Sequence, residues 1–147
     1  MEIKFEKILI ATDGSMRVTR AIDVAIAFAK LTGAKLYAVY VVDTQHIEHP
    51  IRGLPGTDVV QLMHKRGEEA IKKVKLEAEL KNVEFEGAVI EGYPAEAIIE
   101  FALEKKVDLI VMGTLGRTGL NRFLIGSVAE KVVRSSPIPV LTVKAIK

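Results

Sequence analysis

Residues 109–127 read LIVMGTLGRTGLNRFLIGS, an apolar run that passes directly into a glycine-rich segment. The apolar half is short and uninterrupted, as in a strand that is buried on both faces of a parallel sheet. Gly113 and Gly116 follow it at once, and Gly126 with Ser127 then opens another helical segment. A strand that leads through glycines into a helix is typical of an α/β sheet that binds an anion beyond its carboxyl ends.

Strands and helices alternate on both sides of this segment. Amphipathic spacing predicts one helix over 16–32, which Gly33 is expected to end, and others from Val60 to Ala78 and from Pro94. The connection at 44–57 holds two prolines and two glycines without a clear period, so we interpret it as a long loop. Further strands are expected at 7–11, 36–42, 83–86 and 138–143.

The alternation predicts a single α/β domain, a Rossmann-like parallel sheet of five strands with helices on both faces. The strand that begins at Val83 alternates strictly, and the last strand contains Pro139, so both are expected at sheet edges. In such sheets the ligand lies beyond the carboxyl ends of the strands, where the strand order reverses. The chemistry is therefore expected just after a strand.

Composition excludes several classes of protein. The 147 residues carry a net charge of +2 and no Lys/Arg cluster interleaved with aromatic residues, which argues against nucleic-acid binding. Cysteine is absent, so disulfides and thiol chemistry are excluded. No apolar run approaches about 18 residues and the N-terminus does not resemble a signal peptide. We therefore expect a cytoplasmic protein that neither crosses nor binds a membrane.

The glycine-rich segment has two interpretations. In the first, the glycines allow backbone N–H groups to approach an anion, and the N-terminus of the helix that follows favours phosphate. These two anion-binding elements can bind two successive phosphates. Arg117 and Arg122 lie between the two elements in the sequence and could close over the charge. Alternatively, Ser127 and Glu130 form a capping box and the glycines only shape a loop. The joint pattern favours phosphate binding.

The spacing Gly113-xx-Gly116-x9-Gly126-Ser127 resembles the ATP-binding signature of the universal stress protein family. The opening ILIATDGS and the closing SPIPVLTV are similar to that family too, so the resemblance spans residues 1–147. It implies the sheet order 3-2-1-4-5, as in the adenine nucleotide alpha hydrolase-like fold, with ATP between strands 1 and 4. It also implies a stress-response function that depends on nucleotide.

Residue roles follow from this resemblance. The glycines and Ser127 would bind the triphosphate and ribose, Val41 would meet the adenine, and Asp13 would face the ribose or a phosphate-bound Mg²⁺. Capping of the first helix is the other role expected for Asp13, and both roles can hold at once. Ala11 departs from the family, in which many ATP-binding members have proline. The expected ATP-binding residues are Ala11, Thr12, Asp13, Val41, Met112, Gly113, Gly116, Arg117, Gly126, Ser127 and Val128.

The final strand is expected to form a homodimer. It is short, strongly apolar and at a sheet edge, and no charge occurs before Lys144, so it invites pairing with another chain. The resemblance implies the same interface, in addition to an unknown protein partner. The expected interface residues are Val140, Leu141, Thr142 and Val143.

Other chemistries are weakly supported. His46, His49 and His64 have no cysteine or regular carboxylate partner that would make a metal site. No general base lies beside the glycines and no P-loop lysine is present, so catalysis is not assigned to any residue and ATP hydrolysis should be slow. A phospho-receiver domain would need an aspartate where Glu91-Gly92-Tyr93-Pro94 stands, and an adenylating ligase would need a different first loop. A dimeric partner-binding protein that uses little ATP remains the main alternative.

Overall fold

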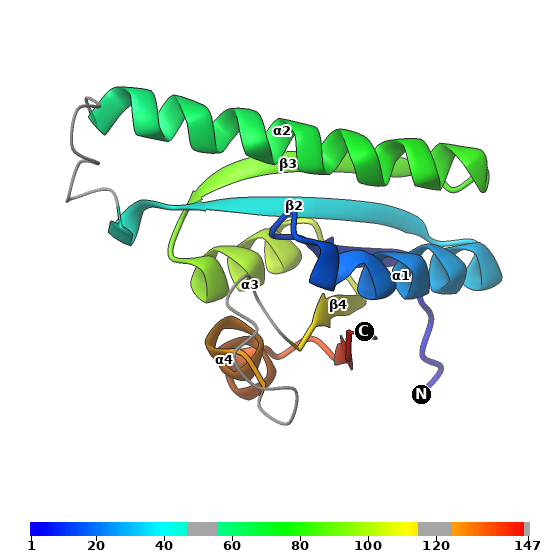
Figure 1. Cartoon of the computed structure of the whole chain (residues 1–147). Helices are drawn as coiled ribbons and strands as arrows, with labels where there is room; N and C mark the ends of the chain where they lie inside the picture. The colour runs from blue at the N-terminus through cyan, green and yellow to red at the C-terminus, as the bar shows by residue number, and fades with distance from the viewer. Residues whose placement is uncertain (47–55, 115–124, 146–147) are drawn as a thin grey trace.

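A computed structural model describes residues 1–46, 56–114 and 125–145 of the chain. These residues form one α/β unit in which strands and helices alternate from the N-terminus to the C-terminus (Figure 1). The elements are β1 (Lys7–Ala11), η1 (Met16–Val18), α1 (Thr19–Thr32), β2 (Lys35–Asp43), η2 (Thr44–His46), α2 (Gly56–Leu80), β3 (Phe85–Gly92), α3 (Pro94–Glu104), β4 (Leu109–Gly113), α4 (Ser127–Ser135) and β5 (Val140–Val143).

The strands form one parallel sheet in the order β3-β2-β1-β4-β5. This order confirms the fold that the sequence predicts, and it confirms that β3 and β5 are edge strands. The chain first builds outward from β1 to β3, and then returns to the other side of β1 to add β4 and β5. The order therefore reverses between β1 and β4, which is the switch point at which ligands bind in such sheets.

Each face of the sheet has its own apolar core. Helices α1 and α2 cover one face, where Ile8 and Ile10 are completely buried, whereas α3 and α4 cover the other face over Leu9. Alternate residues of β1 thus enter different cores, as expected for a strand that is covered on both sides. None of the described helices is long and apolar enough to cross a membrane.

Most element boundaries lie within two or three residues of the predicted ones. Gly33 ends α1 in the left-handed region at φ 72°, and Pro94 is the first residue of α3, as predicted. The strand predicted at 83–86 is found instead at Phe85–Gly92. Val83 is buried in the α1/α2 core ahead of the paired segment, and pairing with β2 continues well beyond the predicted end, to Gly92. Pro139 precedes β5 instead of lying inside it, and its carbonyl accepts a hydrogen bond from the Ile110 amide.

The loop predicted at 44–57 is shorter than expected at both ends. Residues 44–46 form η2, and α2 already begins at Gly56. The rest of the predicted loop lies outside the described residues, so its expected functional importance stays a prediction.

Gly67 lets α2 lie close to the sheet. A Cβ atom at this position would be 2.7 Å from Cδ1 of Tyr40 and 2.9 Å from Cγ1 of Val89. Tyr40 is itself only 1% exposed, so its ring has little room to move. The helix therefore packs on β2 and β3 at a distance that only glycine permits.

Gly67→Ala is expected to destabilise the protein. Crowding of a packed core costs about 1–3 kcal/mol, and alanine recovers up to about 1 kcal/mol through its higher helix propensity. We therefore expect a net loss of about 1 kcal/mol in the free energy of unfolding, measured by chemical denaturation. Glu69→Ala, at an exposed position of the same helix, is the matched control and should change stability by less than about 0.5 kcal/mol. A Gly67→Ala variant as stable as this control would contradict the close-packing argument.

Candidate functional site

The carboxyl ends of β1 and β4 lie side by side at the switch point. Ile10 is in register with Val111, so Ala11 at the end of β1 lies beside the Met112–Gly113 end of β4. Four of the predicted residues also share one face of the sheet: Ala11, Val41 and Val128 are half-buried and pack against the same core as the buried Met112. The structure thus brings together an apolar surface made by three strands and α4.

The turn after β1 is held by its own side chains. Thr12 is 6% exposed, its amide donates to the Val39 carbonyl at 3.0 Å, and its Oγ1 accepts from the Gly14 amide at 3.1 Å. Asp13 Oδ1 accepts a hydrogen bond from the Ser15 amide at 2.9 Å. These bonds fix the Asp13 carboxylate at the end of β1, while Gly14 makes the turn at φ 77°.

Asp13 does not cap the first helix. The residue before α1 is Val18, which makes no side-chain capping bond, and Ser15 occupies the same position before η1. The capping role expected for Asp13 is therefore wrong. Its carboxylate stabilises the turn instead, because it accepts the bond from an amide two residues ahead.

The N-terminus of α4 contacts the end of β4. The Gly126 amide donates a hydrogen bond to the Thr114 carbonyl, so the chain leaves the sheet after Gly113 and returns to the same place before α4 begins. The two glycine-containing elements that the sequence singled out are consequently adjacent in space. This contact is the central feature of the candidate site.

The capping box predicted as the alternative role of Ser127 is not present. Gly126 is the capping residue of α4, with φ −64° and ψ 156° and no side-chain capping bond, and Ser127 is the first helical residue. The Glu130 amide instead donates to the Gly126 carbonyl at 2.9 Å. Ser127 is thus an exposed residue of the first turn without a capping role.

The first turn of α4 can attract an anion. The amides at the start of an α-helix have no partner within the helix, and the macrodipole places partial positive charge there.

Lys131 on α4 bonds to Glu96 on α3, and this hydrogen bond holds the pKa of Glu96 below its ordinary value. The ion pair links α4 to α3 at the protein surface, where such a pair contributes little to stability.

Some of the residues predicted from the sequence lie outside the described part of the chain. Gly116, Arg117 and Arg122 lie outside the described residues, and so does His49.

His64 on α2 forms a hydrogen bond of 2.6 Å with Glu91 Oε1 on β3. Within 1–46, 56–114 and 125–145 no three His, Cys, Asp or Glu side chains gather as a metal site.

Ser15 was not among the site residues predicted from the sequence. Its Oγ is buried and, within the described part of the chain, has no hydrogen-bond partner. It lines a cavity of about 100 Å³ between α1 and α2, together with Thr12 and Lys73. The cavity lies on the α1/α2 face, opposite the apolar surface around Ala11 and Val41. Only a folded turn shows that this hydroxyl points inward, so the sequence carries no signal for it.

Comparison with known proteins gives the family. The profile of the universal stress protein family matches residues 4–144. The chain belongs to the universal stress protein family. Among curated relatives, it is 47% identical to universal stress protein MJ0531 of Methanocaldococcus jannaschii over 97% of this chain and 84% of that protein. It is 40% identical to a universal stress protein of Thermus aquaticus over 95% of this chain and 99% of that protein.

Solved structures support the same assignment. The structure of MJ0577 from Methanocaldococcus jannaschii aligns with a TM-score of 0.87 at 28% identity, over 99% of both chains. A universal stress protein in complex with cAMP aligns with a TM-score of 0.71 at 26% identity, over 97% of this chain and 99% of that one. The protein of Archaeoglobus fulgidus in complex with dAMP gives 0.69 at 25% identity, over 97% and 100%. Nucleotides thus bind to at least two universal stress proteins that share this fold.

Proposed function

We propose that this universal stress protein binds ATP at the carboxyl ends of β1 and β4, and that ATP controls its action in a stress response. One observation carries the proposal: the Gly126–Thr114 hydrogen bond joins the end of β4 to the N-terminus of α4 beside an apolar surface. The relatives solved with cAMP and dAMP support an adenine nucleotide as the ligand. We place the protein in the cytoplasm, where ATP is available.

The proposed pose divides the nucleotide between the two kinds of surface. The adenine lies against Val41 and Ala11, which are half-buried and apolar. The phosphates lie at Gly113 and at the first turn of α4, where Ser127 and Val128 carry amides without helical partners. Gly116 and Arg117 complete the phosphate contacts in this proposal.

Asp13 is the proposed contact for Mg²⁺ or the ribose. Its carboxylate lies in the turn that follows β1, which Thr12 anchors. A single carboxylate does not make a metal site, but Mg²⁺ commonly binds through one carboxylate together with the phosphates of the nucleotide. Turnover is expected to be slow, because the sequence of residues 113–127 contains no histidine, aspartate or glutamate that could act as a general base.

ATP with Mg²⁺ is expected to bind at least about tenfold more tightly than AMP, and AMP more tightly than adenosine. Each added phosphate gains contacts with backbone amides and charged groups, and the Asp13–Mg²⁺ contact requires the β- and γ-phosphates. Isothermal titration calorimetry with and without EDTA measures this order. Equal affinities for ATP, AMP and adenosine would show that the glycine-rich elements do not bind phosphate.

We also propose a homodimer through β5. This strand pairs with β4, and no other described strand pairs with its outer edge. Val140, Leu141 and Thr142 are half-buried, Val143 is buried, and Val133 on neighbouring α4 is 48% exposed. Antiparallel pairing of two β5 strands about a two-fold axis would extend the sheet and cover these partly exposed apolar side chains.

A further inference from the structure

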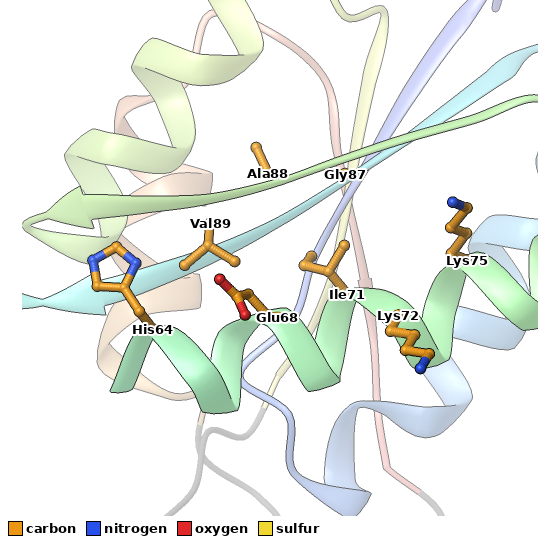
Figure 2. A pocket seen from close by; sticks show the side chains of 8 residues that line it. All are labelled: His64, Glu68, Ile71, Lys72, Lys75, Gly87, Ala88 and Val89. Carbon is orange, nitrogen blue, oxygen red and sulfur yellow. The ribbon is translucent and has the colours of Figure 1, made fainter. Parts of the chain in front are cut away.

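The opposite edge of the sheet, at β3, carries a groove beside α2. The groove has a volume of about 560 Å³ and its residues come from these two elements alone. Figure 2 shows Ile71 at its centre, beside Gly87, with Lys75 toward one end and Glu68 toward Val89 at the other. His64, bonded to Glu91, closes the Glu68 end.

Backbone groups of β3 face this groove edge. The Glu84 carbonyl accepts a hydrogen bond from the Leu36 amide of β2. Because backbone groups alternate in direction along a strand, those of Glu86 and Ala88 also point toward β2. Those of Phe85, Gly87 and Val89 are therefore turned outward. No described strand pairs with this edge. A row of outward N–H and C=O groups is a template for an added strand.

Gly87 explains why the groove exists at mid-strand. A Cβ atom there would collide with Ile71 Cγ2 and lie 3.0 Å from the Phe85 ring. Without a side chain, Gly87 leaves Ile71 half-buried and accessible from the edge. An added strand opposite Gly87 can therefore bury one apolar side chain against Ile71.

Charge defines the two ends of the groove. Lys75 and Glu68 are both exposed, and neither forms an ion pair with another described residue. They are seven residues apart on α2, or about 10 Å along the helix. Side chains at positions i and i+4 of a strand are about 13 Å apart on one face, and long side chains cover the difference. One strand can thus meet both charges.

We propose that the β3 edge binds an extended peptide segment of a partner protein as an additional antiparallel strand. The segment carries an apolar side chain opposite Gly87. Two residues along the segment in one direction it carries an acidic side chain that meets Lys75, and two residues along it in the other direction a basic side chain that meets Glu68. A second copy of the chain fits less well: copies already pair through β5 in the proposed dimer, and a sheet with two self-pairing edges polymerises.

The test uses the full chain and a fluorescein-labelled peptide, Thr-Lys-Thr-Leu-Thr-Glu-Thr. Fluorescence anisotropy is expected to give a dissociation constant below about 1 mM. N-methylation of the leucine amide removes the bond to the Gly87 carbonyl while it keeps every side chain, and should weaken binding at least fivefold. Lys75→Glu should weaken binding of the first peptide about fivefold, and a peptide with its Glu replaced by Lys should restore it.

Two controls separate this site from the other proposals. Lys73→Glu makes the same charge change on the same helix outside the groove, and should leave peptide affinity unchanged. Gly126→Val, which is aimed at the nucleotide site, should leave it unchanged as well. Absence of binding at 1 mM, or equal affinity of the N-methylated peptide, overturns the proposal. So does a wild-type assembly larger than a dimer in sedimentation that Lys75→Glu reduces, because the edge then binds a second copy.

Discussion

Gly126→Val is expected to weaken ATP binding by more than about 100-fold, or about 2.7 kcal/mol, while the protein stays folded. At φ −64° and ψ 156° the backbone of Gly126 has a conformation that any residue adopts, so its backbone conformation does not demand glycine. Valine also keeps the amide that bonds to Thr114 and the carbonyl that accepts from Glu130. What it adds is a branched side chain where the phosphates are proposed to approach the backbone.

The measurement pairs calorimetric titration of ATP with thermal unfolding of the same sample. Gly126→Ala is the matched variant: its smaller side chain should give an intermediate loss of affinity. Ser127→Ala should change stability little, because Ser127 makes no capping bond. A folded Gly126→Val variant with wild-type affinity would mean that the close approach of phosphate to this residue does not occur.

Leu141→Lys is expected to convert the proposed homodimer into a monomer, with a dimer dissociation constant raised more than about 100-fold. Two copies of the new lysine would be brought close together in a desolvated strand pair. Sedimentation velocity at micromolar concentration measures the change. Leu31→Lys, the same substitution at a leucine that is 86% exposed at the end of α1, is the matched control and should leave the mass unchanged.

A second variant separates the interface from the fold. The Pro139 carbonyl accepts a hydrogen bond from the Ile110 amide of β4, and the Val143 carbonyl accepts one from the Thr114 amide. Because the backbone groups of successive residues in a strand point to opposite sides, the Thr142 amide points away from β4. Thr142→Pro removes that outward donor and keeps the bonds to β4, as edge strands tolerate. It too should yield a monomer. A monomeric wild type, or a Thr142→Pro protein that remains dimeric, would refute pairing through β5.

The sequence predicted the fold well because buried strands and capped helices leave local signals. The apolar run at Lys7–Ala11 and the stop at Gly33 are determined by neighbours a few residues away, and both are confirmed. Strand limits were less accurate where burial and pairing differ: Val83 is buried but unpaired. The strand order came from the family resemblance, because no local pattern states which strands are neighbours.

The candidate site was predicted in part for the same reason. The spacing of Gly113 and Gly126 indicated two elements, and the structure places them in contact through Thr114. The Ser-x-x-Glu pattern suggested a cap that Gly126 provides instead, since a glycine can occupy the capping position without a side-chain bond. Gly87 had no signal at all, because its role depends on Ile71 reaching it from another element.

The strand order also governs how the chain folds during synthesis. When residue 92 has been synthesised, the chain contains β1, β2 and β3, together with α1 and α2, which cover one face of the sheet. Leu9, Tyr37 and Val39 then remain uncovered, and the second edge of β1 stays open until β4 arrives about 100 residues after β1. Long-range pairing of this kind is slow, and uncovered apolar strands aggregate. A stalled or truncated chain is therefore expected to expose apolar strands, because the first strand is not protected until part of the last third of the sequence has been made.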